Sequence, residues 1–141
     1  MVGARRSCGW RQWRVDDALE RAKALFFDGN TRFAAGDFAG AAAAFEHSLE
    51  LAPGRASTLA NLGAARVRAG RPAEAIPVLE QALAREPDDL QSRGHLGLAC
   101  AAVGRHADAL ACHDRVLAAE PGHAASWLAR GEALRFLERH D

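Results

Sequence analysis

Apolar positions recur at helical spacing over most of this chain of 141 residues. One segment shows the pattern well, with apolar residues at positions i, i+3, i+4, i+7 and i+11, namely Phe38, Ala41, Ala42, Phe45 and Leu49. Such a stripe covers one face of an α-helix and predicts that this face packs against another element.

Turn-forming residues separate the predicted helices. Gly36 follows the Ala-rich segment 22–35 and suits the left-handed conformation that ends a helix. Asp37 can cap the next helix through its carboxylate, and Pro53 cannot extend that helix beyond its end. In the next unit, Gly70 is predicted to end the first helix, Pro72 suits the opening turn of the second, and Pro87 ends that helix.

The arrangement repeats with a period of 34 residues. Four independent sets of residues share this interval: Gly29, Gly63, Gly97 and Gly131; Gly36, Gly70 and Gly104; Ala41, Ala75 and Ala109; Pro53, Pro87 and Pro121. A period of this length is typical of solenoids in which each repeat is a pair of helices.

The period divides the chain into a tail and a repeat domain. A disordered basic tail is expected over residues 1–15, and a repeat domain over 16–141, with its first helix starting near Ala18. The units are 22–55, 56–89 and 90–123, followed by a partial unit or capping helix over 124–141. Close contacts are expected within the helix pairs at Gly29/Ala41, Gly63/Ala75 and Gly97/Ala109.

The second unit resembles the tetratricopeptide repeat (TPR) family. It carries the residues of the family pattern at Leu59, Asn61, Leu62, Gly63, Gly70, Glu74, Ala75, Ile76, Leu79, Ala82, Leu83 and Pro87. The third unit departs most, with Arg93, Cys100 and His113 at positions that are usually apolar or aromatic. The resemblance implies an all-α fold, a right-handed superhelical solenoid of about seven helices in antiparallel pairs.

Composition excludes several classes of protein. The formal net charge is zero, with 18 basic and 18 acidic residues, which argues against a nucleic-acid binder. No apolar run is long enough to span a membrane, and no secretory signal precedes the repeats. The three cysteines, Cys8, Cys100 and Cys112, form no paired motif, so we expect a cytoplasmic protein with reduced thiols.

Catalytic and metal-binding patterns are not found in the sequence. Cys112 and His113 are adjacent and would point about 100° apart on a helix, so they cannot share one metal ion. A phosphate-binding loop of the GxxxxGK[ST] type is also missing, since Lys23 is the only lysine. We therefore expect no catalytic residue, no metal and no cofactor.

The resemblance places the first helix of each unit on the concave face of the superhelix. We expect a peptide or partner protein to bind there, and no small-molecule substrate. The candidate binding residues are Lys23, Phe26, Asn30, Phe33, Ser57, Asn61, Arg68, Gln91, His95, Glu132 and Arg135. The exposed side of the last helix is a candidate surface for pairing two copies of the chain.

Some members of the family bind the acidic C-terminus of chaperones through a clamp of lysine, arginine and asparagine side chains. Asn30 and Asn61 fall on the two amide positions, but Phe26, Gln91 and His95 occupy the three cationic positions. Because the charge-assisted hydrogen bonds would be lost, we do not expect this clamp to form.

The two ends of the chain leave alternatives open. The chain stops where a further second helix would begin. One alternative is that the last helix caps the solenoid. The other is that the chain is the front of a longer repeat array, or of an enzyme such as a transferase whose repeats would select the substrate or oligomerise the protein. Residues 1–14 combine four arginines with Trp10 and Trp13, a composition that also occurs in sites that stack on single-stranded nucleic acid.

Overall fold

A computed structural model describes the backbone of residues 2–140 and the side chains of residues 16–139. Within this part, seven helices and no strand are formed, and no helix combines the length and the apolar character needed to cross a membrane. The helices are α1 (Val2–Ala34), α2 (Phe38–Leu51), α3 (Ala56–Arg68), α4 (Pro72–Arg85), α5 (Leu90–Ala102), α6 (His106–Ala119) and α7 (Ala124–His140).

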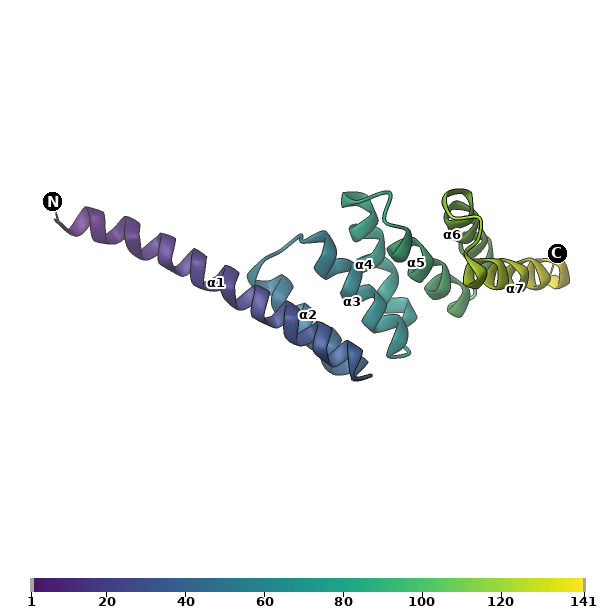
Figure 1. The fold of residues 1–141 in the computed structure, drawn as a ribbon, viewed down its shortest axis with the longest axis horizontal. Coiled ribbons are helices and arrows are strands. Elements are labelled where there is room, and N and C mark those ends of the chain that lie inside the picture. Colours follow the sequence, from purple (N-terminus) through teal and green to yellow (C-terminus); the bar gives the residue numbers. More distant parts are fainter. Residues whose placement is uncertain (1, 141) are drawn as a thin grey trace.

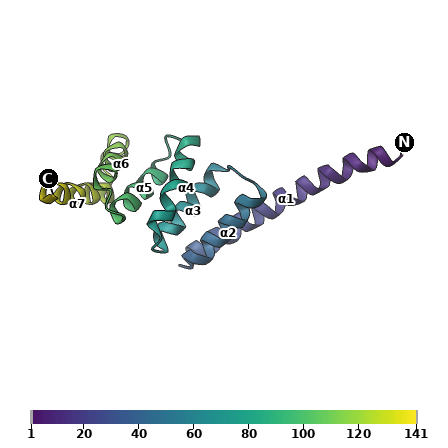
Figure 2. The same ribbon diagram turned by 180° about the vertical axis from the view of Figure 1, so that it is seen from behind.

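The helices stack in sequence order into an elongated solenoid (Figures 1 and 2). Each helix packs mainly against its two neighbours along the chain, and α3 also packs against α5. The two termini lie at opposite ends of the stack (Figure 1). The expectation of an all-α solenoid is therefore confirmed.

Helix ends follow the predicted turn chemistry. The Asp37 carboxylate accepts a hydrogen bond from the backbone N–H of Gly40 at 2.9 Å and so caps α2. Gly36, Gly70 and Gly104 have φ values of 83°, 79° and 87°. They close the first helix of each pair in the left-handed conformation that glycine adopts most readily.

A repeated glycine contact joins the two helices of each pair. A Cβ atom placed on Gly29, Gly63 or Gly97 would lie 2.4–2.6 Å from a side chain of the facing helix. Those side chains belong to Phe45, Leu79 and His113.

The side chains nearest to these glycines are therefore not those of Ala41, Ala75 and Ala109, as was expected. The three alanines are fully buried, but the space above each glycine is filled by the larger residue one turn further along. A glycine leaves a hole that only a large side chain can fill at normal packing density.

The first helix is longer than expected. A helix start near Ala18 and a disordered tail over 1–15 were expected, but α1 begins at Val2 and its first part projects beyond α2 (Figure 1). No proline interrupts residues 2–34, so the backbone hydrogen bonds can continue through the region expected to be a cap. The alternative of nucleic-acid contact by residues 1–14 concerns side chains outside the described residues.

The glycine contact predicts the effect of adding one methyl group. Gly63→Ala would push a Cβ into Leu79 and should lower the free energy of unfolding by about 1–3 kcal/mol. Gly131→Ala is the matched control, because that glycine lies within α7 with no heavy atom within 4 Å of its added Cβ. The control should be neutral or stabilising by up to about 1 kcal/mol. Urea unfolding followed by circular dichroism measures both, and equal midpoints would refute the contact.

Candidate functional site

A cavity of about 490 Å³ opens between α1, α3, α5 and the start of α7. The first helices of the three pairs provide most of its wall, while the second helices provide two buried residues at its base. The lining consists of Asn30, Phe33, Ala34, Phe45, Asn61, Ala64, Arg68, Leu90, Gln91, Gly94, His95, Leu98, His113, His123, Ala125 and Ser126.

Two asparagines link α1 and α3 across this cavity. The Asn61 side-chain NH₂ donates a hydrogen bond of 2.9 Å to the side-chain oxygen of Asn30. Because an amide offers two donor hydrogens and an acceptor oxygen, the Asn30 NH₂ and the Asn61 oxygen remain available to a ligand. This arrangement suits hydrogen bonding to a peptide backbone.

Arg68 is the permanent cation of the cavity. Its guanidinium carbon lies 4.8 Å from the centroid of the Phe38 ring, and Phe38 in turn contacts Phe33 edge to face. Among the described residues Arg68 has no carboxylate partner. The aromatic stack orients the guanidinium while leaving its N–H groups free.

Burial favours the neutral form of two histidines in the cavity. Burial lowers the pKa of His95, and the nearby Arg68 lowers it further, while Asp89 opposes these effects. Burial, followed by the charge of His123, lowers the pKa of His113. His95 Nδ1 and His113 Nε2 are buried without a hydrogen-bond partner among the described residues.

His113 occupies an unusual place for an imidazole. Its side chain is only 3% exposed, and it packs over Gly97 as Phe45 and Leu79 pack over their glycines. Its Nδ1 lies 3.4 Å from the Ser126 hydroxyl. A polar ring therefore stands where the other two units have an apolar residue.

A second, smaller cavity of about 240 Å³ lies nearer the N-terminus. The aromatic rings of Phe26 and Phe27 meet edge to face beside it, and Phe27 is 64% exposed. Two cations border the cavity, of which Lys23 also pairs with Glu20 at 3.2 Å. Its lining is Lys23, Phe26, Phe27, Arg55, Ser57 and Thr58.

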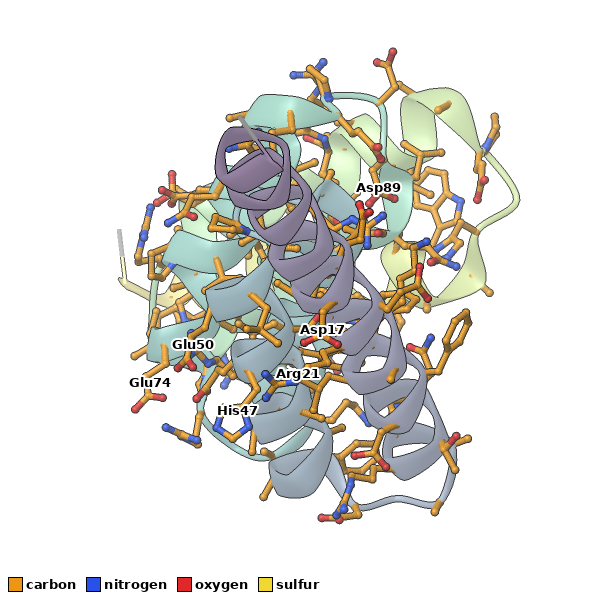
Figure 3. All side chains as sticks on the ribbon, turned by 90° about the vertical axis from the view of Figure 1, so that its left-hand side faces the viewer. Asp17, Arg21, His47, Glu50, Glu74 and Asp89 are labelled. Atoms are coloured by element: carbon orange, nitrogen blue, oxygen red, sulfur yellow. The ribbon has the colours of Figure 1, made fainter. Side chains whose placement is uncertain are left out.

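Among the described residues, the linings of the two cavities contain no acidic side chain, although the chain has 18 acidic residues. Acidic side chains such as Glu50 on α2 and Glu74 on α4 are exposed instead on the side of the second helices (Figure 3). The nearest acids that the structure records at the cavities are Glu20, which pairs with Lys23, and Asp89, which acts on His95.

The two cavities gather most of the residues predicted from the sequence. The larger cavity contains Asn30, Phe33, Asn61, Arg68, Gln91 and His95, and the smaller one contains Lys23, Phe26 and Ser57. Glu132 and Arg135 line neither cavity and are exposed on α7. Since α7 is the last described helix, no neighbouring helix faces them across a groove.

Several cavity residues were missed by the sequence analysis, above all His113, His123 and Ser126. The sequence did contain a signal for Ser126, since Thr58, Ser92 and Ser126 recur at the 34-residue period. In the structure each of the three is 1% exposed. The contact between His113 and Ser126 could not be predicted, since it joins two different units.

The described cysteines are core residues. Cys100 and Cys112 are buried as free thiols, and burial raises the pKa of Cys112 to about 11. A thiol with this pKa is protonated at neutral pH and is a poor nucleophile. Within the described residues no group of three or more His, Cys, Asp or Glu side chains is arranged to hold a metal ion.

Comparison with known proteins gives one family. A sequence model for the tetratricopeptide repeat matches residues 32–93 and 66–133. No curated protein sequence matches the chain.

Solved structures with the same fold include several TPR domains. The first TPR domain of Spaghetti (RPAP3), bound to an HSP90 peptide, is 21% identical with a TM-score of 0.79, over 85% of this chain and 95% of that one. The TPR domain of Arabidopsis OM64 is 17% identical with a TM-score of 0.78, over 82% and 96% of the two chains. YrrB, described as a TPR protein with an unusual peptide-binding site, is 26% identical with a TM-score of 0.78, over 88% and 66%.

The buried His113 predicts a pH dependence of stability. Because its pKa in the folded state lies below the ordinary 6.5, the unfolded chain binds the proton first as the pH falls below that value. Stability should therefore be highest above pH 6.5 and decrease at lower pH. His113→Leu should be more stable than the parent by about 1–2 kcal/mol at pH 5.5, with a smaller gain at pH 8.

The control for this prediction is His47→Gln, on the exposed side of α2 (Figure 3). Urea unfolding of the parent and both variants at pH 5.5 and pH 8 measures the effect. A parent and His113→Leu that lose the same stability on acidification would contradict the assignment.

Proposed function

Because this chain belongs to the tetratricopeptide repeat family, we propose that it is a non-catalytic interaction module that binds a peptide segment of a partner protein in the groove of its first helices. Structures of the same fold, such as the first TPR domain of RPAP3 and the TPR2B domain of yeast Sti1, are complexes with chaperone peptides from HSP90 and Hsp70. The HSP90 and Hsp70 peptides are ligands of RPAP3 and Sti1. They support the proposal that this chain also binds a peptide.

The observation that carries the proposal is the hydrogen-bonded Asn30–Asn61 pair in the wall of the larger cavity. The pair leaves one amide donor group and one amide oxygen unused. An extended peptide backbone presents carbonyl and N–H groups that match both. Phe33 and Leu98 provide apolar surface in the same cavity for a side chain of the ligand.

The two cavities favour an extended ligand over a single small molecule. The smaller cavity includes Phe26, and the larger includes Asn30 and Phe33, which follow on α1 within two helical turns. A peptide lying along α1 would therefore place one side chain in each cavity. The exposed ring of Phe27 at the smaller cavity adds apolar contact area.

Replacing the polar groups of the groove tests the proposal. The triple variant Asn30→Ala, Asn61→Ala, Arg68→Ala should bind a partner isolated by affinity purification at least about tenfold more weakly, because it loses several hydrogen bonds and a charge at the centre of the site. Isothermal titration calorimetry with the purified partner measures the affinity.

The matched control changes three exposed residues of the second helices, Glu50→Ala, Gln81→Ala and Arg115→Ala. This variant should bind the partner as the parent does. If the groove variant stays folded by circular dichroism and its affinity remains within about twofold of the parent, the groove is not the binding site.

A further inference from the structure

The outer side of α7 carries a glycine that no described helix covers. α7 lies at the end of the stack opposite to α1 (Figures 1 and 2). It packs on α6 and more weakly on α5, so its other side faces solvent. Gly131 lies on that side, one repeat after Gly97. His113 covers Gly97, whereas a Cβ added to Gly131 would have no heavy atom of the described residues within 4 Å. The position that joins the two helices of each pair is therefore open on α7.

Large apolar side chains flank this open position. Trp127 and Leu128 lie one turn before Gly131 in α7. Leu134 lies one turn after it, so these side chains share one face of the helix. Trp127 is 52% exposed and Leu128 is 66% exposed. In the second unit, Leu59 holds the position of Trp127 and is only 5% exposed. An apolar face that is buried inside the stack is thus exposed on α7.

Seven residues form this outer face of α7, because helical geometry places them within about 60° of the direction of Gly131. They are Ala124, Trp127, Leu128, Gly131, Leu134, Arg135 and Glu138. None of them lines either cavity. The outer face is therefore a surface distinct from the groove.

The Trp127 ring is held in place before any partner arrives. Its indole Nε1 donates a hydrogen bond of 2.7 Å to the backbone carbonyl of Pro121. The guanidinium carbon of Arg130 lies 5.8 Å from the centroid of the ring, and Arg130 is itself paired with Asp114 of α6 at 2.7 Å. A fixed aromatic ring loses little entropy on association, and such rings carry much of the affinity of many interfaces.

The outer face is complementary to a second copy of itself. Trp127 and Leu134 lie on one flank of Gly131, three or four residues to either side of it. Leu128 and Arg135 lie on the other flank in the same way. When two α7 helices cross antiparallel at Gly131 about a two-fold axis, each flank meets the same flank of the second copy. Trp127 then packs on Leu134, and Leu128 packs on the aliphatic stem of Arg135. The glycine at the centre lets the two backbones approach closely.

The charges of the outer face also match a second copy. The face carries one base, Arg135, and one acid, Glu138. In the antiparallel pair, Glu138 lies beside the N-terminal end of the other α7 at Ala124, where the helix dipole favours a carboxylate. A face without net charge gives no advantage to a strongly acidic or basic partner, and two chains of zero formal charge do not repel each other at long range. The occupant that these features favour is a second copy of this chain.

We propose that two copies of this chain associate through the outer face of α7, with the two helices antiparallel and crossing at Gly131. The inference goes beyond the proposed function, because the groove binds its peptide with other residues. The contact between two single helices is small, so the dimer is weak and reversible. It would present two grooves at once, and a partner with two matching segments would bind the dimer more tightly than the single chain.

Sedimentation velocity of the full chain tests the dimer. Over concentrations from about 1 µM to about 1 mM, the weight-average mass should rise from 15.0 kDa toward the mass of two chains. A mass that stays at 15.0 kDa at the highest concentration would overturn the proposal.

Gly131→Glu separates the interface from the fold. In the single chain the new side chain extends into open space, and glutamate favours a helix more than glycine does. In the dimer it places two carboxylates against each other at the two-fold axis. The dissociation constant of the dimer should therefore rise at least about tenfold. Circular dichroism should show the helix content of the parent.

Leu128→Arg should weaken the dimer as well, because its new cation would lie beside Arg135 of the second copy. The matched control is Leu19→Arg, which makes the same change at an exposed leucine of α1, at the opposite end of the stack (Figure 1). The control should associate as the parent does. If Gly131→Glu and Leu128→Arg associate like the parent, or if the control loses association as strongly, the outer face is not the interface.

NMR spectra (¹H–¹⁵N) at several protein concentrations locate the contact. The signals of the Trp127 indole and of the Gly131 and Leu134 amides should shift with concentration. The signals of Asn30 and Asn61 in the groove should not. Concentration-dependent shifts confined to the groove or to α1 would place self-association at another surface and so refute the proposal. A chain that stays monomeric but binds a peptide in the groove would refute the dimer and leave the proposed function standing.

Discussion

The fold depends on one steric constraint, the packing of a large side chain over a glycine in each helix pair. Phe45, Leu79 and His113 fill the spaces above Gly29, Gly63 and Gly97, where a Cβ would come within 2.6 Å of them. This contact brings the two helices of a pair close together, and the pairs then stack in order because each buries its apolar stripe on the next. The stacking of the pairs, and the groove along their first helices, depend on this close approach of the two helices.

The groove acquires its chemistry where the units differ from one another. A polar His113 stands at the position that is Phe45 in the first unit and Leu79 in the second, and so brings an imidazole to the base of the cavity. The separation of Asn30 and Asn61 in the sequence is three residues shorter than one repeat, so they do not occupy equivalent positions. Their side chains nevertheless form a hydrogen bond between α1 and α3. The helix packing thus repeats from unit to unit, whereas the polar residues of the cavity do not.

The sequence was sufficient to predict the fold and part of the site. The 34-residue period and the helix-ending glycines predicted the helix pairs, and six candidate residues line the larger cavity. The start of α1 was missed because a capping pattern near Asp17 also fits the middle of a helix. The Ser126–His113 contact was missed because it joins two units. Glu132 and Arg135 line neither cavity, since no described helix stands opposite them.

The first turn of α7 forms part of the larger cavity through Ala125 and Ser126, and this gives the last helix a role in affinity. Among the described helices, α7 packs on α6 and more weakly on α5, and so has neighbours on one side only. A ligand that touches both α1 and α7 would hold the far end of the stack in place. A ligand in the larger cavity would therefore join the first and the last described helices of the stack, which have no direct contact of their own.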